Sequence, residues 1–259
     1  MKRCLLYLLL ILIPFSAALP REGEWEKATS THFIVYYKKA QEEFIRLIID
    51  KSEDYYNRIA YNLGFTRFNF WLWDNRAKIY IHDNPQEFQS ATGQPSWSGG
   101  CAQVNTKTIH SYPYAQGFTE TILPHEMGHI IFREFVGYDN ASIPLWLDEG
   151  VAAYQEKARH IAANRISREA IRTGEFINLA RLSRINQDML EGGNLVQIFY
   201  AESLSIVDFL VKEYGTERFV YFCQNLRDKK DLESAIKTGY SFNNIQELDS
   251  AWQKYLKEQ

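Results

Sequence analysis

The 259-residue sequence predicts an α+β fold, in which a small mixed sheet with one helix precedes a largely helical remainder. Two observations support this class. Short runs rich in β-branched and aromatic residues occur in the first part of the chain, and apolar residues recur at helical spacing in one long stretch there and in several later ones. With 46% apolar and 15% aromatic residues, the chain has enough apolar surface for one sizeable core.

The N-terminus has the pattern of a secretory signal peptide over residues 1–18. Lys2 and Arg3 precede an apolar run at 4–13, and small residues at 16–18 form a cleavage site. The run is too short to span a bilayer comfortably, which leaves an uncleaved anchor as the minor alternative. We therefore expect a secreted or periplasmic protein with no stable membrane insertion after signal cleavage.

Residues 19–259 are expected to form a single domain, with a sheet-containing part at about 25–115 and a helical part at about 116–259. No internal repeat, low-complexity segment or linker divides them. The net charge of −3, or −5 without the two basic leader residues, gives no reason to expect nucleic acid as a partner. An oxidising compartment permits a disulfide between Cys101 and Cys223, but sequence alone establishes neither this pairing nor an oligomeric state.

The first part of this domain contains two predicted strands and a long helix. Residues 32–37 and 78–82 have the composition of strands. Between them, apolar residues at helical spacing from 39 to 63 predict an amphipathic helix that ends at Gly64. The other elements expected here are a partly stranded aromatic stretch at 65–73, a short helix starting at 84–88, a loop at 94–100 and a polar strand from Cys101 to His110.

Helices are predicted for the remainder of the chain. Gly215 should end the longest of them, and a turn-rich break at 191–194 should precede it. The predicted helical stretches are 145–158, 156–172, 195–214, 219–226 and 245–256.

One pentapeptide, His125-Glu126-Met127-Gly128-His129, lies at the centre of the chain. Two histidines at i and i+4 project from one face of a helix, so their ring nitrogens can converge on one cation. Imidazoles and a carboxylate are the ligands of catalytic zinc sites, and a glutamate beside the first histidine is placed to accept a proton from water. The motif predicts a metal centre.

The setting of this motif is apolar. A largely buried helix is therefore expected, in which unpaired polar side chains would cost several kcal/mol. The alternative is that these are ordinary core residues satisfied by hydrogen bonds. Thr119 or Thr121 is expected to cap the helix, and Gly128 would allow a second helix to approach closely.

The second helix is predicted to start at Ser142-Ile143-Pro144, with proline in its first turn. Glu149 lies near its beginning, among apolar neighbours. A carboxylate on a helix packed against the histidine-bearing helix is suited to be a third metal ligand, whereas an ordinary surface glutamate is the alternative.

These residues resemble the gluzincin zinc metallopeptidases, the thermolysin-like and aminopeptidase-like zincins, and more narrowly the small peptidase MA-like family. In that family a hydrophobic H-E-x-x-H helix precedes the pattern P-x-W-L-x-E-G-x-A-x-Y, which this chain matches from Pro144 to Tyr154. Weaker features, including a short docking segment at 175–182, extend the resemblance over most of the mature chain. It implies a zincin-like metallopeptidase domain with Zn²⁺ as cofactor, with His125, His129 and Glu149 as metal ligands and Glu126 as the general base.

The resemblance also implies a place for the substrate. In gluzincins an edge strand before the active-site helix commonly pairs with extended substrate through main-chain hydrogen bonds. The corresponding stretch here is Gly99–Val104, with Gly99, Gly100 and Ala102 as substrate-binding candidates. A plain surface strand covered by its own loop is the alternative.

Related families supply an oxyanion donor from beyond the third ligand. Tyr200 is the candidate here, with Tyr214 and Tyr154 behind it, and the alternative is a core aromatic at helical spacing. Thermolysin-like proteins also carry an acidic residue four positions after the third ligand, where this chain has Ala153. Support for the histidines must therefore come from elsewhere, with Asp148 as one candidate.

The sequence thus predicts a secreted or periplasmic zinc metallopeptidase that hydrolyses peptide bonds in a peptide or protein substrate through a zinc-activated water. No amine-binding acidic motif of the aminopeptidase type is evident, which favours an endopeptidase. Two other classes stay open. One is a catalytically weak or inactive, metal-organised binding protein of the cell envelope, against which the retained Glu126 argues. The other is a helical protein without metal, whose polar cluster would lie on the surface.

Overall fold

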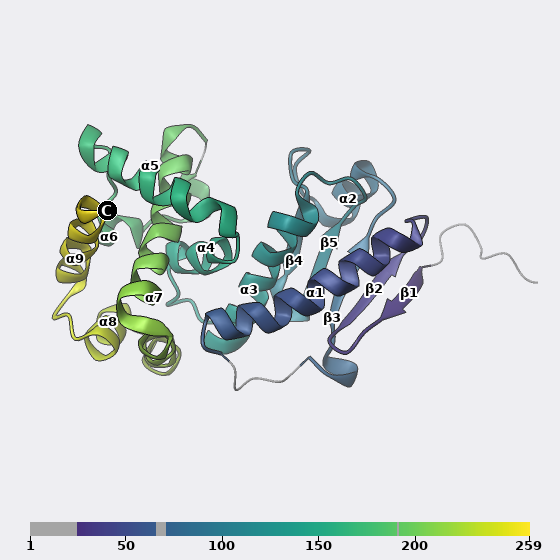
Figure 1. The fold of residues 1–259 in the computed structure, drawn as a ribbon, viewed down its shortest axis with the longest axis horizontal. Coiled ribbons are helices and arrows are strands. Elements are labelled where there is room, and N and C mark those ends of the chain that lie inside the picture. Colours follow the sequence, from purple (N-terminus) through teal and green to yellow (C-terminus); the bar gives the residue numbers. More distant parts are fainter. Residues whose placement is uncertain (1–24, 66–70, 191) are drawn as a thin grey trace, which may run out of the picture.

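The computed structural model describes residues 25–65, 71–190 and 192–259, which form two parts side by side (Figure 1). One part is a five-stranded sheet with its helices, and the other consists of helices. This mixed α+β architecture agrees with the predicted class. The expected signal peptide at 1–18 lies outside the described residues, as do residues 66–70 of the aromatic stretch at 65–73.

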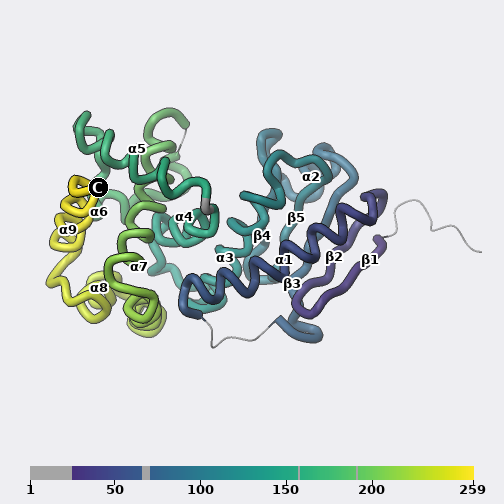
Figure 2. Tube along the Cα trace, viewed as in Figure 1, coloured from purple at the N-terminus to yellow at the C-terminus, as the bar shows by residue number. Residues whose placement is uncertain are grey.

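The sheet has the strand order β1-β2-β3-β5-β4. Its three central strands β2, β3 and β5 are parallel, and β1 and β4 join them as antiparallel edges. Helix α1 (Glu42–Asn62) connects β2 to β3 and crosses the sheet (Figures 1 and 2). The strands are β1 Glu26–Thr29, β2 Phe33–Tyr37, β3 Ala77–Ile81, β4 Gly100–Gln103 and β5 Thr108–Ser111.

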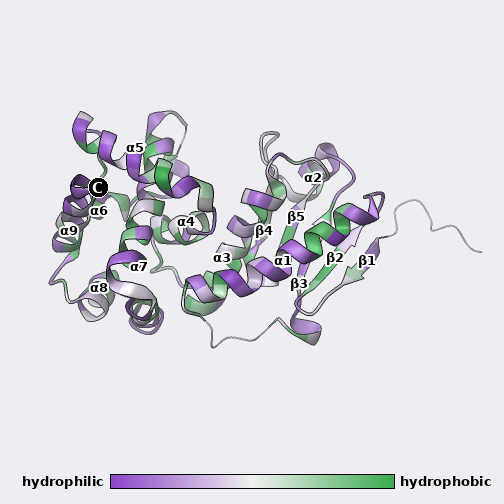
Figure 3. Ribbon diagram, viewed as in Figure 1, coloured by the Kyte–Doolittle hydropathy of each residue, from purple (hydrophilic) through white to green (hydrophobic). Residues whose placement is uncertain are grey.

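The core of this part lies between the sheet and two helices, α1 and α3. Val35, Ile79 and Ile109 stand side by side across the three parallel strands, and all are fully buried. Ile48 and Ile59 of α1 are also fully buried, whereas the outer face of this helix is polar. Figure 3 shows this division as hydrophilic and hydrophobic colours alternating along α1. The amphipathic helix that the apolar periodicity predicts is therefore confirmed.

The predicted single strand from Cys101 to His110 is wrong. The chain forms a hairpin there, in which β4 and β5 flank a short turn at Val104–Thr106. Lys107 takes the left-handed backbone conformation (φ +50°) that reverses the chain. Glycine or asparagine usually occupies such a position, so a lysine there is no local signal of a turn. The hairpin makes β4 the edge of the sheet.

Helices make up the second part, and α3 and α4 lead the chain into it (Figure 2). Strand β1 and helix α8 were not predicted, because β1 is mostly exposed and α8 is short. The remaining helices are α2 Pro85–Thr92, α3 Leu123–Val136, α4 Leu145–Tyr154, α5 His160–Thr173, α6 Leu179–Leu182, α7 Asn194–Lys229, α8 Leu232–Tyr240 and α9 Ile245–Glu258.

Helix α7 is the central helix of this part. Gly215 interrupts it with a non-helical conformation (φ +82°, ψ 161°), which agrees with the predicted break. In the described chain it is the one helix that is long and apolar enough to cross a membrane by length and composition, although 72% of its most apolar window is buried inside the fold. Cys101 and Cys223 are both free thiols, so the possible disulfide is not formed.

Candidate active site

Helix α3 presents the two histidines without a side-chain cap. A π-helical turn at Phe118–Ile122 runs directly into α3, so its carbonyl groups precede the first amides of the helix. Thr119 donates its hydroxyl to the Glu120 carboxylate (2.6 Å), and Thr121 donates to the Gly117 carbonyl (2.6 Å). The prediction that one of these threonines caps α3 is therefore wrong.

Three predicted metal ligands converge between α3 and α4. The Nε2 atoms of His125 and His129 lie 3.2 Å apart. The Oε2 atom of Glu149 lies 3.5 Å from the first of these nitrogens and 3.7 Å from the second. All three side chains are largely buried, with 14–18% of their surface exposed. Their candidate ligand atoms fall within 4.8 Å of one another, so this group could hold a metal ion.

The spacing of these atoms fits a tetrahedral ion. Ligand atoms bound at about 2.0–2.1 Å in tetrahedral geometry lie roughly 3.3 Å from one another. The separations of 3.2, 3.5 and 3.7 Å come close to this value before any adjustment of the side chains. Two imidazoles and one carboxylate are also the donor types of catalytic zinc sites, so the residues present fit a zinc ion.

The second ring nitrogen of His129 faces the carboxylate of Asp148, which in turn accepts a hydrogen bond from Arg133. Its Nδ1 lies 3.1 Å from Oδ1 of Asp148, and Arg133 donates from Nε (2.8 Å) to the other oxygen of that carboxylate. Arg133 also donates to the Asn140 carbonyl (3.2 Å). The Asp148 contact orients the ring with Nε2 toward the ligand group, which is the role usual for an outer carboxylate.

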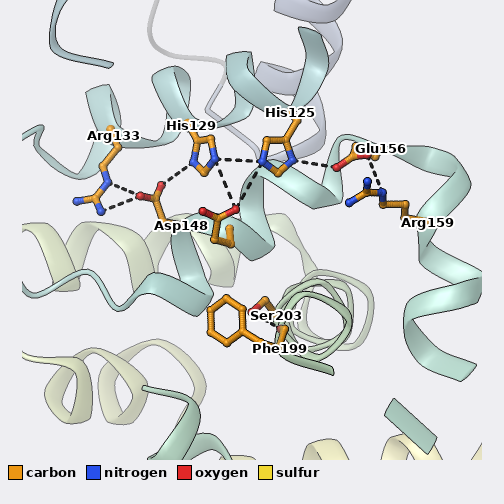
Figure 4. Close-up of polar contacts among 9 residues, drawn as sticks. His125, His129, Arg133, Asp148, Glu156, Arg159, Phe199 and Ser203 are labelled. Carbon is orange, nitrogen blue, oxygen red and sulfur yellow. Dashed lines mark hydrogen bonds and ion pairs between the residues drawn. The ribbon is translucent and has the colours of Figure 1, made fainter. Parts of the chain in front are cut away.

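His125 has the same type of support from a residue that was not predicted. Its Nδ1 lies 2.9 Å from Oε1 of Glu156, and Oε2 of this buried glutamate lies 2.9 Å from Nε of Arg159. Glu156 follows the C-terminus of α4, seven residues after Glu149. Figure 4 shows the resulting row of side chains, which runs from Arg133 through Asp148, His129, His125 and Glu156 to Arg159.

Charges in this buried cluster shift several pKa values. Burial lowers the pKa of His125, but hydrogen bonds to Glu149 and Glu156 outweigh it and raise the pKa to about 10. The pKa of Glu149 moves below its ordinary value, because hydrogen bonding to His125 and the nearby charges outweigh burial. The pKa of Asp148 is lowered in the same way by His129 and Arg133. The carboxylates thus favour positive charge between them, which a bound cation would also provide.

Two glycines let the helices of the site approach each other. A Cβ atom on Gly128 would lie 2.8 Å from the Ala152 Cα of α4, which agrees with the predicted close approach. A Cβ on Gly150 would lie only 2.2 Å from the Ser203 carbonyl oxygen of α7. Glu149 is therefore carried on a helix whose position is fixed from two sides.

The ligand group opens into a cleft of about 920 Å³. Glu126 lines this cleft, as do Gly99 and Gly100 at the start of the edge strand β4. A Cβ atom on either glycine would lie 2.6 Å from the Ile122 side chain, which explains the absence of a side chain there. Ala102 does not line the cleft, and its side chain packs against the core.

Tyr200 of α7 also lines the cleft. Burial and the charge of Glu149 raise the pKa of its phenol, while a hydrogen bond with the Gln187 side chain acts in the opposite direction. Tyr200 thus lines the same cleft as the ligand group, and its role as an oxyanion donor stays a prediction. The sequence did not single out Arg133, Glu156 or Arg159, because their contacts depend on how three helices pack. In the sequence, the only feature that could have pointed to Glu156 is that this residue is acidic and lies close to Glu149.

Comparison with known proteins identifies the family to which this chain belongs. None of the curated proteins that were searched matches the chain. A family model described as the Peptidase MA superfamily matches residues 73–258, which span both the sheet-containing and the helical parts. This region is more than two thirds of the sequence and includes every residue of the ligand group. The chain therefore belongs to the Peptidase MA superfamily.

Proposed function

We propose that the protein is a zinc-dependent metallopeptidase of the gluzincin type that hydrolyses internal peptide bonds. The observation that supports this most strongly is the near-tetrahedral spacing of His125, His129 and Glu149 in the lining of a cleft that Glu126 also lines. Membership in the Peptidase MA superfamily supports the same reaction class. We also propose that the protein is secreted or periplasmic, because residues 1–18 have the pattern of a signal peptide.

A zinc ion held by the three ligands would supply Lewis acidity, which lowers the pKa of water and polarises a peptide carbonyl. Glu126 then accepts a proton from the attacking water and passes it to the leaving amine. The phenol of Tyr200 donates a hydrogen bond to the oxyanion that develops on the substrate carbonyl. Asp148 and Glu156 keep the two imidazole rings in place throughout.

The edge strand β4 gives the substrate a place to bind. Its start at Gly100 lies in the cleft, and among the described residues no further strand pairs with its outer edge, although Ser98 donates its hydroxyl to the Gly100 carbonyl (2.9 Å). An extended peptide that pairs with this edge would be recognised through its main chain. Gly99 and Gly100 both line the cleft, so their backbone groups lie where such a peptide would bind.

The test combines metal content with peptide cleavage. We expect one zinc per chain in the purified protein, loss of the metal in Glu149→Ala, and retained metal but abolished cleavage of a peptide library in Glu126→Gln. Glu213→Gln is the control, because this glutamate is exposed on α7 and does not line the cleft. Zinc without cleavage of any peptide would favour a metal-organised binding protein. Absence of stoichiometric metal would refute the proposal.

A further inference from the structure

Arg159 is the one lysine or arginine among the described residues that line the cleft. Its side chain is 57% exposed, and it belongs to the same cavity as the metal-ligand group. Its positive charge also acts on the phenol of Tyr200, where it partly offsets the rise in pKa caused by burial. Three glutamates, Glu126, Glu149 and Glu156, line the same cleft. A negatively charged substrate group is therefore accommodated best beside Arg159.

The two arginines of the site differ in how many of their guanidinium nitrogens already contact other described residues. Arg133 uses Nε and Nη2 on Asp148 and Nη1 on the Asn140 carbonyl, and it does not line the cleft. Arg159 forms an ion pair with Oε2 of Glu156 through Nε alone (2.9 Å), and this contact lacks hydrogen-bond geometry. Within the described part of the chain, its two terminal nitrogens make no hydrogen bond or ion pair. A guanidinium that uses only Nε in an ion pair keeps the edge formed by its two terminal nitrogens for a second planar anion.

We propose that Arg159 determines specificity by binding a carboxylate of the peptide substrate. This inference rests on the proposed function, and it adds the substrate class: a peptide with an acidic side chain or a C-terminal carboxylate within reach of Arg159. A guanidinium binds a carboxylate through two parallel hydrogen bonds, a geometry that neutral amides do not match. The ion pair with buried Glu156 favours side-chain conformations in which Nε faces that carboxylate before substrate arrives.

The alternative is that Arg159 only neutralises Glu156 and thereby supports His125. Arg133 has only this supporting role for the other histidine, because it contacts Asp148, which contacts His129. Arg133→Gln is therefore the matched control. Arg159→Gln removes the cation from the cleft, and Arg159→Lys keeps the charge but not the planar donors. Metal content is measured for every variant, so that loss of zinc is separated from loss of substrate recognition.

The substrates are matched peptides in which one position at a time is Glu or Gln, each made with a free or an amidated C-terminus. We expect the wild type to favour the carboxylate form by about 10- to 100-fold in kcat/KM, mainly through KM. Arg159→Gln should lose this ratio, Arg159→Lys should keep part of it, and Arg133→Gln should keep it fully. The position of the preferred carboxylate distinguishes an acidic side chain from the C-terminus.

Binding is measured in addition by calorimetry on zinc-loaded Glu126→Gln, with and without Arg159→Gln, using the same peptides. A carboxylate preference that disappears with Arg159→Gln supports the proposal even if no peptide is cleaved, an outcome that would refute only the hydrolytic function. The proposal is overturned if neither assay gives a carboxylate preference, if Arg159→Gln retains the preference, or if Arg133→Gln abolishes it equally.

Discussion

The Nδ1 atom of His125 lies 2.9 Å from a carboxylate oxygen of Glu156, a residue seven positions beyond the proposed third ligand. This contact fixes the imidazole with Nε2 toward the ligand group and makes it a better donor. We expect Glu156→Gln to weaken zinc affinity by about 10-fold, and Glu156→Ala by about 100-fold, because only the alanine variant loses the hydrogen-bond acceptor as well as the charge. Competition with a zinc chelator measures the affinity.

The matched variant for this prediction is Asp148→Asn, which alters the corresponding contact of His129. It should weaken affinity in the same direction. If Glu156→Ala bound zinc as tightly as the wild type, Glu156 would have no role in orienting His125.

Gly150 allows α4 to lie against α7. A methyl group there would stand 2.2 Å from the carbonyl oxygen of Ser203, and backbone cannot move aside as a flexible side chain does. We therefore expect Gly150→Ala to reduce the free energy of unfolding by about 1–3 kcal/mol and to displace neighbouring Glu149. Urea denaturation gives the stability, and zinc titration gives the effect on the ligand. An unchanged denaturation midpoint would contradict the close contact.

Glu202 makes stability depend on pH. Its side chain is fully buried on α7, and burial raises its pKa to about 9, although the Ile177 amide donates to it. The unfolded chain has an ordinary glutamate pKa of about 4.3, so between these values the native state binds more protons than the unfolded state. The stabilisation is thus complete below the unfolded pKa and is lost as pH rises toward 9.

We expect Glu202→Gln to flatten this dependence. The amide stays neutral at all pH values and can still accept from Ile177, so the variant should melt higher than the wild type at pH 8–9 and about equally at pH 5. Thermal melting across this range is the measurement, with Glu213→Gln on the exposed side of α7 as control. Parallel pH profiles for wild type and Glu202→Gln would show that Glu202 is not protonated in the fold.

Tyr200 is proposed to act only as charge develops on the substrate. Tyr200→Phe removes the phenol but keeps the ring that packs beside Phe199. We expect kcat to fall by about 100-fold, with KM and zinc content nearly unchanged, because the lost hydrogen bond belongs to the transition state. Tyr214→Phe is the control, since Tyr214 does not line the cleft. A loss confined to KM would assign Tyr200 to substrate binding instead.

The sequence determined the features that depend on local geometry. A helix places residues four apart on one face, so the convergence of His125 and His129 followed from the motif itself. The apolar periodicity likewise predicted the long helices, and glycine predicted the break at Gly215. The pattern around Glu149 identified the carboxylate that joins the histidines, because its neighbours are those of a buried helix.

Only the tertiary structure decided which residues support that group. Glu156 reaches His125 from beyond the end of α4, and Arg159 pairs with Glu156 through Nε while its terminal nitrogens have no hydrogen bond or ion pair within the described residues. The β4–β5 hairpin depends on the left-handed conformation of Lys107, for which the sequence has no local signal. These features arise where separate elements pack together. Their energies come from non-local contacts, which residue spacing along one element does not encode.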